Sequence, residues 1–202
     1  SPAFVARVNY HGVKGLRVGA SFYYNQTAKN GTKPWRNTGY KFPVTIVTGD
    51  LQYKGFNNNL IVRGNAVYGN LGASGALTTI NNSSSAASGY PNTTVAQNAV
   101  SYGGEAGYNI GSFFHSKAPR IYPFIRYEYY NPMEKTEANT GLLADKRFQV
   151  SAVTAGLNYY ALPNLVIKAD YTHRSIGGGK YNDENLVSVG TVSYTHLRAH
   201  ET

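Results

Sequence analysis

The chain has 202 residues, a formal net charge of +9, 18 tyrosines and no cysteine. Only 14% of its residues are charged, against about 25% in an ordinary soluble domain, and it contains no run of about 20 apolar residues that could form a transmembrane helix. The lack of cysteine excludes disulfides and thiolate metal sites, and the scattered lysines and arginines form no cluster of the kind that binds nucleic acid.

Alternation of apolar and polar residues, which is the period of an extended chain, predicts strands along most of the sequence. In IRYEY (125–129), the isoleucine and both tyrosines fall on one side, while Arg126 and Glu128 fall on the other. Nine strands are predicted, at residues 3–12, 15–26, 43–54, 60–71, 98–113, 120–131, 148–161, 164–174 and 185–194. Most have roughly the 9–11 residues that a tilted strand needs to cross a bilayer. No helix of consequence is expected.

The connections between the predicted strands alternate in length. The short connections are GVKG, KGFNNN, HSKAP and ALPN, and the long ones contain TAKNGTKPWRNTGYKF, INNSSSAASGYPNTT, PMEKTEANTGLLADK and SIGGGKYND. Short turns at one end and long loops at the other are typical of outer-membrane barrels. A soluble sandwich has no physical reason to keep this alternation through eight connections.

The two faces of the predicted sheet differ sharply in charge. The apolar face carries no charged residue in any of the nine strands. The opposite face holds the eleven charged residues that are candidates for lining a polar interior: Arg7, Arg17, Asp50, Lys54, Arg63, Glu105, Arg126, Glu128, Lys168, Asp170 and Arg174. This segregation alone fits any antiparallel sheet with one solvated face.

Two details of the apolar face favour lipid over a protein core. Positions near the strand ends are repeatedly Tyr or Phe, as in the aromatic girdles of membrane barrels. Positions in the middle are often Ala, Gly or Val, which are too small to build a thick sandwich core. The sequence therefore predicts an all-β fold in which residues 1–192 form part of a transmembrane antiparallel up-and-down β-barrel.

Two segments resemble a known family. The strand IYPFIRYEYYNPM (121–133) and the later hairpin TAGLNYYALPNLVIKADYTHRS (154–175) are similar to the C-terminal half of the phosphate-selective porin O/P family, which comprises Bacteroidetes-type outer-membrane porins. The resemblance covers about residues 120–190. It implies a barrel of 16 or 18 strands, of which this chain supplies the C-terminal nine, with the signal peptide and the earlier strands missing.

The last ten residues, SYTHLRAHET, lose the strand alternation and resemble translated adaptor sequence, so 193–202 are expected to be a non-native tail. His196 and His200 in this tail have the i, i+4 spacing of two metal ligands, but they lack the catalytic glutamate of that motif. The GGGK at 177–180 lacks the Ser or Thr of a phosphate-binding loop. No serine elbow accompanies any histidine, so no catalytic residue, metal site or cofactor is predicted, and the protein is not expected to be an enzyme.

The expected function is a passive porin for small hydrophilic solutes in a bacterial outer membrane. Seven of the eleven interior charges are basic and four are acidic, which favours small anions slightly, and the resemblance implies phosphate. The same charges could instead only form cross-strand pairs that stiffen a wet wall. The expected partners are outer-membrane lipid and lipopolysaccharide, with a homotrimer as one possible assembly. The alternatives are a non-pore barrel that presents its loops as an adhesin or scaffold, and a secreted soluble β-protein that binds glycans.

Overall fold

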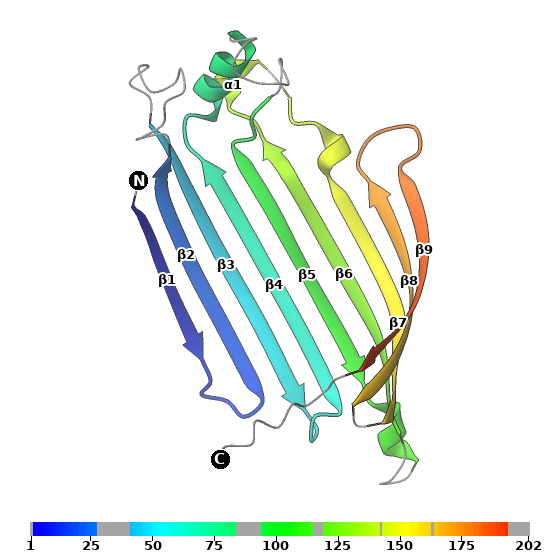
Figure 1. The fold of residues 1–202 in the computed structure, drawn as a ribbon. Helices are drawn as coiled ribbons and strands as arrows, with labels where there is room; N and C mark the ends of the chain where they lie inside the picture. Colours follow the sequence, from blue (N-terminus) through cyan, green and yellow to red (C-terminus); the bar gives the residue numbers. More distant parts are fainter. Residues whose placement is uncertain are drawn as a thin grey trace, which may run out of the picture.

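The computed structural model describes residues 2–27, 41–83, 94–114, 119–141, 143–162 and 164–193. It contains one nine-stranded antiparallel sheet in which every strand pairs with its neighbours in sequence, in the order β1 to β9 (Figure 1). The strands are β1 (Ala3–Tyr10), β2 (Leu16–Thr27), β3 (Phe42–Gly55), β4 (Leu60–Leu71), β5 (Asn98–Tyr108), β6 (Arg120–Lys135), β7 (Val150–Leu162), β8 (Leu165–Ile176) and β9 (Asp183–Ser193). The helices within these residues are α1 (Ser74–Ser83) and three short 3-10 turns, η2 (Ile110–Phe113), η3 (Ala138–Thr140) and η4 (Lys146–Phe148).

All nine predicted strands are present, and most of their ends lie within two residues of the predicted ends. The largest errors are at β5, which stops at Tyr108 instead of residue 113, and at β6, which continues to Lys135. The β5 strand ends because Asn109 leaves the ladder: its side chain bonds to the side chain of Asn59 and to the backbone of Ile121. The chain then turns into η2. The expected tail lies almost wholly outside the described residues.

The expectation that the chain has no helix of consequence is wrong. The ten-residue helix α1 follows β4 in the serine- and asparagine-rich connection. Its N-terminus is held from another loop, because the Glu137 carboxylate accepts the Gly75 amide at 2.6 Å and the Ser74 hydroxyl at 3.3 Å. Within the helix the buried Thr78 hydroxyl accepts the Val95 amide at 3.0 Å. None of the helices in the described residues is long and apolar enough to cross a membrane.

The register places the predicted apolar positions on one face throughout. Directly paired residues in an antiparallel ladder point to the same side. One such row joins Ala6, Phe22, Val47, Tyr68 and Val100 from β1 to β5. The eleven charged residues predicted for the other face all occupy the alternate positions, so the predicted segregation is confirmed within the predicted strand bounds. Beyond those bounds, Lys135 at the end of β6 and Asp183 at the start of β9 lie on the apolar side at the loop end of the sheet.

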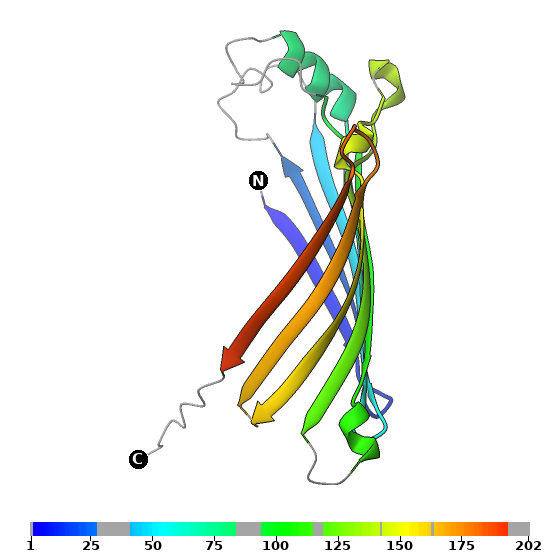
Figure 2. The ribbon, with the colours of Figure 1, turned by 90° about the vertical axis from the view of Figure 1, so that its right-hand side faces the viewer.

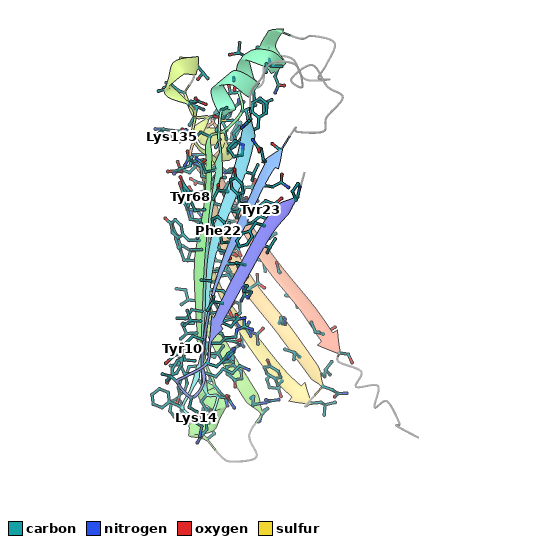
Figure 3. The ribbon with its side chains drawn as sticks, turned by 90° about the vertical axis from the view of Figure 1, so that its left-hand side faces the viewer. Tyr10, Lys14, Phe22, Tyr23, Tyr68 and Lys135 are labelled. Carbon is teal, nitrogen blue, oxygen red and sulfur yellow. The ribbon has the colours of Figure 1, made fainter. Side chains whose placement is uncertain are left out.

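The sheet is curved and open, since β1 pairs only with β2 and β9 only with β8 (Figure 2). In Figure 3, Tyr10 and Tyr68 of the apolar face lie on the convex side, and Phe22 and Tyr23, consecutive in β2, lie on opposite sides. Tyr23 pairs in register with Ile46 and belongs to the face that carries the charges, so that face is concave. The nine-stranded up-and-down sheet is confirmed, but these residues do not close it into a barrel.

Little of the apolar surface is covered. In the described part of the chain, four large apolar side chains are buried, and all belong to the concave face and lie near strand ends: Phe42, Tyr122, Val150 and Val166. The convex face remains exposed, as shown by Val8 at 72% and Ile125 at 59%. An apolar face left open across a whole sheet is unusual for a domain surrounded by water, because such domains bury that face against a second layer.

Candidate functional site on the concave face

Two neighbouring rows of side chains cross the middle of the concave face. The row nearer the β1–β2 turn, here called the basic row, contains Arg17, Gln52, Arg63, Glu105, Arg126, Thr154 and Thr172. The row two residues closer to the end of the sheet that carries α1, here called the acidic row, contains Asn9, Gly19, Asp50, Asn65, Gly103, Glu128, Ala152, Arg174 and Glu184. Eight of the eleven predicted site residues lie in these rows or beside them and form ion pairs.

Asp50 is shared by two arginines. Its Oδ2 accepts Arg7 Nη2 at 2.7 Å, and its Oδ1 lies 3.5 Å from Arg17 Nη2. Arg7 reaches Asp50 across β2, where Gly19 stands between the two side chains. A β-carbon on Gly19 would overlap both the Arg7 guanidinium and the Asp50 carboxylate. The absence of a side chain at Gly19 therefore permits this pair.

Glu105 is shared in the same way. Arg126 donates through Nε at 2.9 Å and through Nη2 at 2.5 Å to Glu105 Oε2, while Arg63 Nη1 lies 3.5 Å from Oε1. Arg126 also lies 4.0 Å from Glu128, which stands two residues further along β6. Each shared carboxylate is thus flanked by two guanidiniums, and each trio keeps one unit of positive charge.

The remaining predicted residues behave differently. Arg174 pairs with Glu184, a residue absent from the predicted site because β9 begins two residues earlier than the sequence pattern suggested. Lys54, Lys168 and Asp170 lie on the same face but form no ion pair with any described residue. Cross-strand ion pairing thus holds for Asp50, Glu105 and Arg174, but not for Lys54, Lys168 or Asp170 among the described residues.

Most of these side chains remain accessible to water. The arginine side chains of the two trios are 40–58% exposed, whereas Glu105 is 19% exposed. Exposed ion pairs contribute only about 0–1 kcal/mol each, so the rows add little to the stability of the sheet. Their main physical effect is to place fixed charges of both signs along a hydrated wall.

Two hollows lie over the rows. One has a volume of about 470 Å³ and extends from β2 to β6, with Arg17, Arg63, Asn65, Glu105 and Glu128 among its lining residues. The other has a volume of about 640 Å³ and lies mainly over β5–β9, lined by Tyr130, Thr172, Arg174 and Glu184, among others. Both volumes are in the range of small-molecule sites, about 300–1,000 Å³.

At the loop end of the sheet, one ion pair joins two residues that are close in sequence, Asp145 and Arg147. Arg147 in η4 donates from its backbone amide and its guanidinium to the Asp145 carboxylate, with distances between 2.6 and 3.1 Å. The hydrogen bonds from the Arg147 side chain, followed by the one from its amide, hold the pKa of Asp145 below its ordinary value. The pKa of Arg147 is raised by the same contact.

Among the described residues, no three His, Asp or Glu side chains gather closely enough to hold a metal ion. His115, His196 and His200 lie outside the described residues. Comparison of the sequence with protein-family models gives no match, and comparison with curated proteins gives none either. A function must therefore be argued from the sheet and its concave face.

Proposed function

We propose that the chain is part of an outer-membrane porin, a passive channel for small hydrophilic solutes. The observation that carries the proposal is the segregation of faces over nine consecutive strands: away from the loop end the convex face is uncharged and uncovered, and the concave face is lined with charges. A curved sheet of this kind is stable if its convex side meets hydrocarbon and its concave side meets water.

The dimensions of the sheet support this proposal. The strands from β2 to β9 have 11–16 residues, and β7 has 13. A strand of 13 residues is about 44 Å long at 3.4 Å per residue, and a tilt of about 45° reduces the thickness that it spans to about 31 Å. This matches the hydrocarbon core of a bilayer, about 30 Å. The open edges of β1 and β9 would pair with further strands of the same barrel, because unpaired backbone groups are too costly in lipid.

The concave face supports conduction over chemistry. It carries exposed charges of both signs and two hollows that are open to solvent. Fixed charges along a hydrated pore wall act on passing ions through their electric field. The predicted residues together with Glu184 comprise seven basic and five acidic side chains, so the wall favours small anions mildly. Phosphate would be the solute if the chain belongs to the porin family that it resembles.

Two measurements on the full-length protein that contains these strands test the proposal. It should partition into membranes or detergent, and it should give stepwise conductance in a planar bilayer. Arg126→Ala should keep the conductance and shift the reversal potential in a salt gradient towards weaker anion preference. Membrane insertion without conductance would leave an adhesin or scaffold barrel, and a protein that stayed in the aqueous phase would refute every membrane role.

A further inference from the structure

The hollow over β2–β6 is balanced in charge, and its two signs are separated along the strands. Arg17, Arg63 and Arg126 lie in the basic row, while Asp50 and Glu128 lie in the acidic row. Glu105 is the exception, since it lies between two arginines of the basic row and is largely screened by them. A solute in this hollow therefore meets positive charge on the turn side and negative charge on the α1 side.

Two charged side chains of this hollow are only weakly paired within the protein and can therefore contact a solute. Glu128 is 53% exposed, and its nearest cation, Arg126, is as far away as 4.0 Å. Asp50, by contrast, is held by Arg7 at 2.7 Å. Arg63 is 58% exposed and touches Glu105 at 3.5 Å, so most of its five N–H donors are free. Glu128 and Arg63 are thus the acid and the base best able to bind a visiting group.

Gly103 leaves room between Glu128 and Asn65. It pairs with Asn65 on one side and with Glu128 on the other, and all three lie in the acidic row. A β-carbon at Gly103 would lie 2.9 Å from the Tyr127 carbonyl oxygen, 3.3 Å from Glu128 Cγ and 3.6 Å from Asn65 Oδ1. Because Gly103 has no side chain, the space between the Glu128 side chain and the Asn65 amide oxygen is left open. A carboxylate and an amide oxygen both accept hydrogen bonds from an ammonium group.

The spacing of the rows selects a length. Two residues along a strand cover about 6.8 Å, which is therefore the separation between the acidic and the basic row. An extended chain of two residues spans about 7 Å between its ends. Asn65 and Arg63 are two residues apart on β4, so the ammonium and the carboxylate of a dipeptide match their separation, and Glu128 approaches the same end from β6 across Gly103. A single inorganic anion can use only the basic row.

We propose that this hollow binds short zwitterionic peptides of dipeptide length, with the ammonium at Glu128 and Asn65 and the carboxylate at Arg63. The inference rests on the proposed pore, because it assigns a class of solute to the wall of that pore. A dipeptide then gains two charge-assisted contacts, whereas a singly charged solute of the same size gains one and a neutral solute gains none.

Block of single-channel current by three probes tests this assignment. Alanylalanine carries both charges, N-acetyl-alanylalanine lacks the ammonium, and alanylalanine amide lacks the carboxylate. Alanylalanine should have the lowest half-blocking concentration of the three. Glu128→Gln should raise that concentration about tenfold for alanylalanine and leave the N-acetyl probe unchanged, and Arg63→Gln should raise it similarly and leave the amide unchanged.

The control variants Lys14→Gln and Asp183→Asn remove the same charges outside the hollow and should not alter the order of the three probes. Equal block by all three probes, or block that follows net charge alone, would overturn the dipeptide site while normal conductance left the pore intact. A protein that inserts and gives no conductance would overturn the pore, and the site with it. The conductance measured before any probe is added separates these two failures.

Discussion

The apolar convex face makes a quantitative prediction at Leu157. This residue lies one position from the middle of β7, about 3.4 Å along the strand, so the proposed orientation places it near the bilayer midplane. An arginine there should cost about 2–4 kcal/mol. Leu157 is already 40% exposed, so the loss of its packing contributes less than the introduced charge. The cost corresponds to a decrease of about 30-fold to 700-fold in the folding equilibrium constant.

The assay is reversible urea unfolding of the full-length barrel in lipid vesicles. Asn158→Arg is the matched control, because it introduces the same side chain one residue away on the concave face, beside Lys168. It should change the free energy of unfolding by less than about 1 kcal/mol. A silent Leu157→Arg combined with a damaging Asn158→Arg would mean that the convex face meets water, and the membrane orientation would have to be abandoned.

Three further predictions concern the loop end. Glu137→Ala should remove the carboxylate that caps α1, cost about 1 kcal/mol locally and speed hydrogen exchange at the Gly75 amide, while Glu137→Gln, which keeps an acceptor, should change it less. The folded-state pKa of Asp145 is lowered, so its contact with Arg147 should contribute its full stabilisation above the unfolded pKa of about 3.9 and lose it as the pH falls through the lowered value. Hydrogen exchange at the Arg147 amide that stayed unchanged on acidification would contradict this. A cysteine at Gly141 should react with an impermeant reagent on intact cells, whereas one in the β3–β4 turn should not; the reverse result would invert the topology.

The sheet could be predicted from sequence because each strand has two unlike faces. A slip of one residue would move charged side chains such as Arg126 to the convex side and apolar ones such as Ile125 to the concave side, so the pattern fixes both the strand and its register. Four of the eight connections are short, and strands joined by a short turn pair antiparallel. This is why the errors are confined to strand ends.

Helix α1 could not be predicted in the same way. Its sequence, SGALTTINNS, is poor in strong helix formers and has no charged residue at either end. The contacts that stabilise it come from outside, because Glu137 lies about sixty residues further along the chain. Tertiary contacts of this kind override local propensity, and no periodicity in the segment reveals them.

The sequence predicts which residues belong to the candidate site, but not how they pair. Alternation places the charged residues on one face, but which carboxylate serves which arginine depends on neighbours across the sheet. The Arg7–Asp50 pair spans β2 and exists only because Gly19 lies between, a relation that needs the register of three strands. Glu184 was missed because aspartate and glutamate at the start of β9 resemble the end of a loop.

The pairing also changes how the basic excess should act. A count of charges on the concave face predicts attraction of anions, yet Asp50 and Glu105 each neutralise part of two arginines. The electric field at a solute comes from the charge that is not neutralised by pairing. Salt screens most of the field from charges more than about 8 Å away. At that range the separation of Glu128 from Arg63 matters more than the sum over the whole wall. The anion preference of the open pore should therefore be small and should fall further as salt is raised, whereas block by a dipeptide should persist, because its two contacts are made at hydrogen-bonding distance.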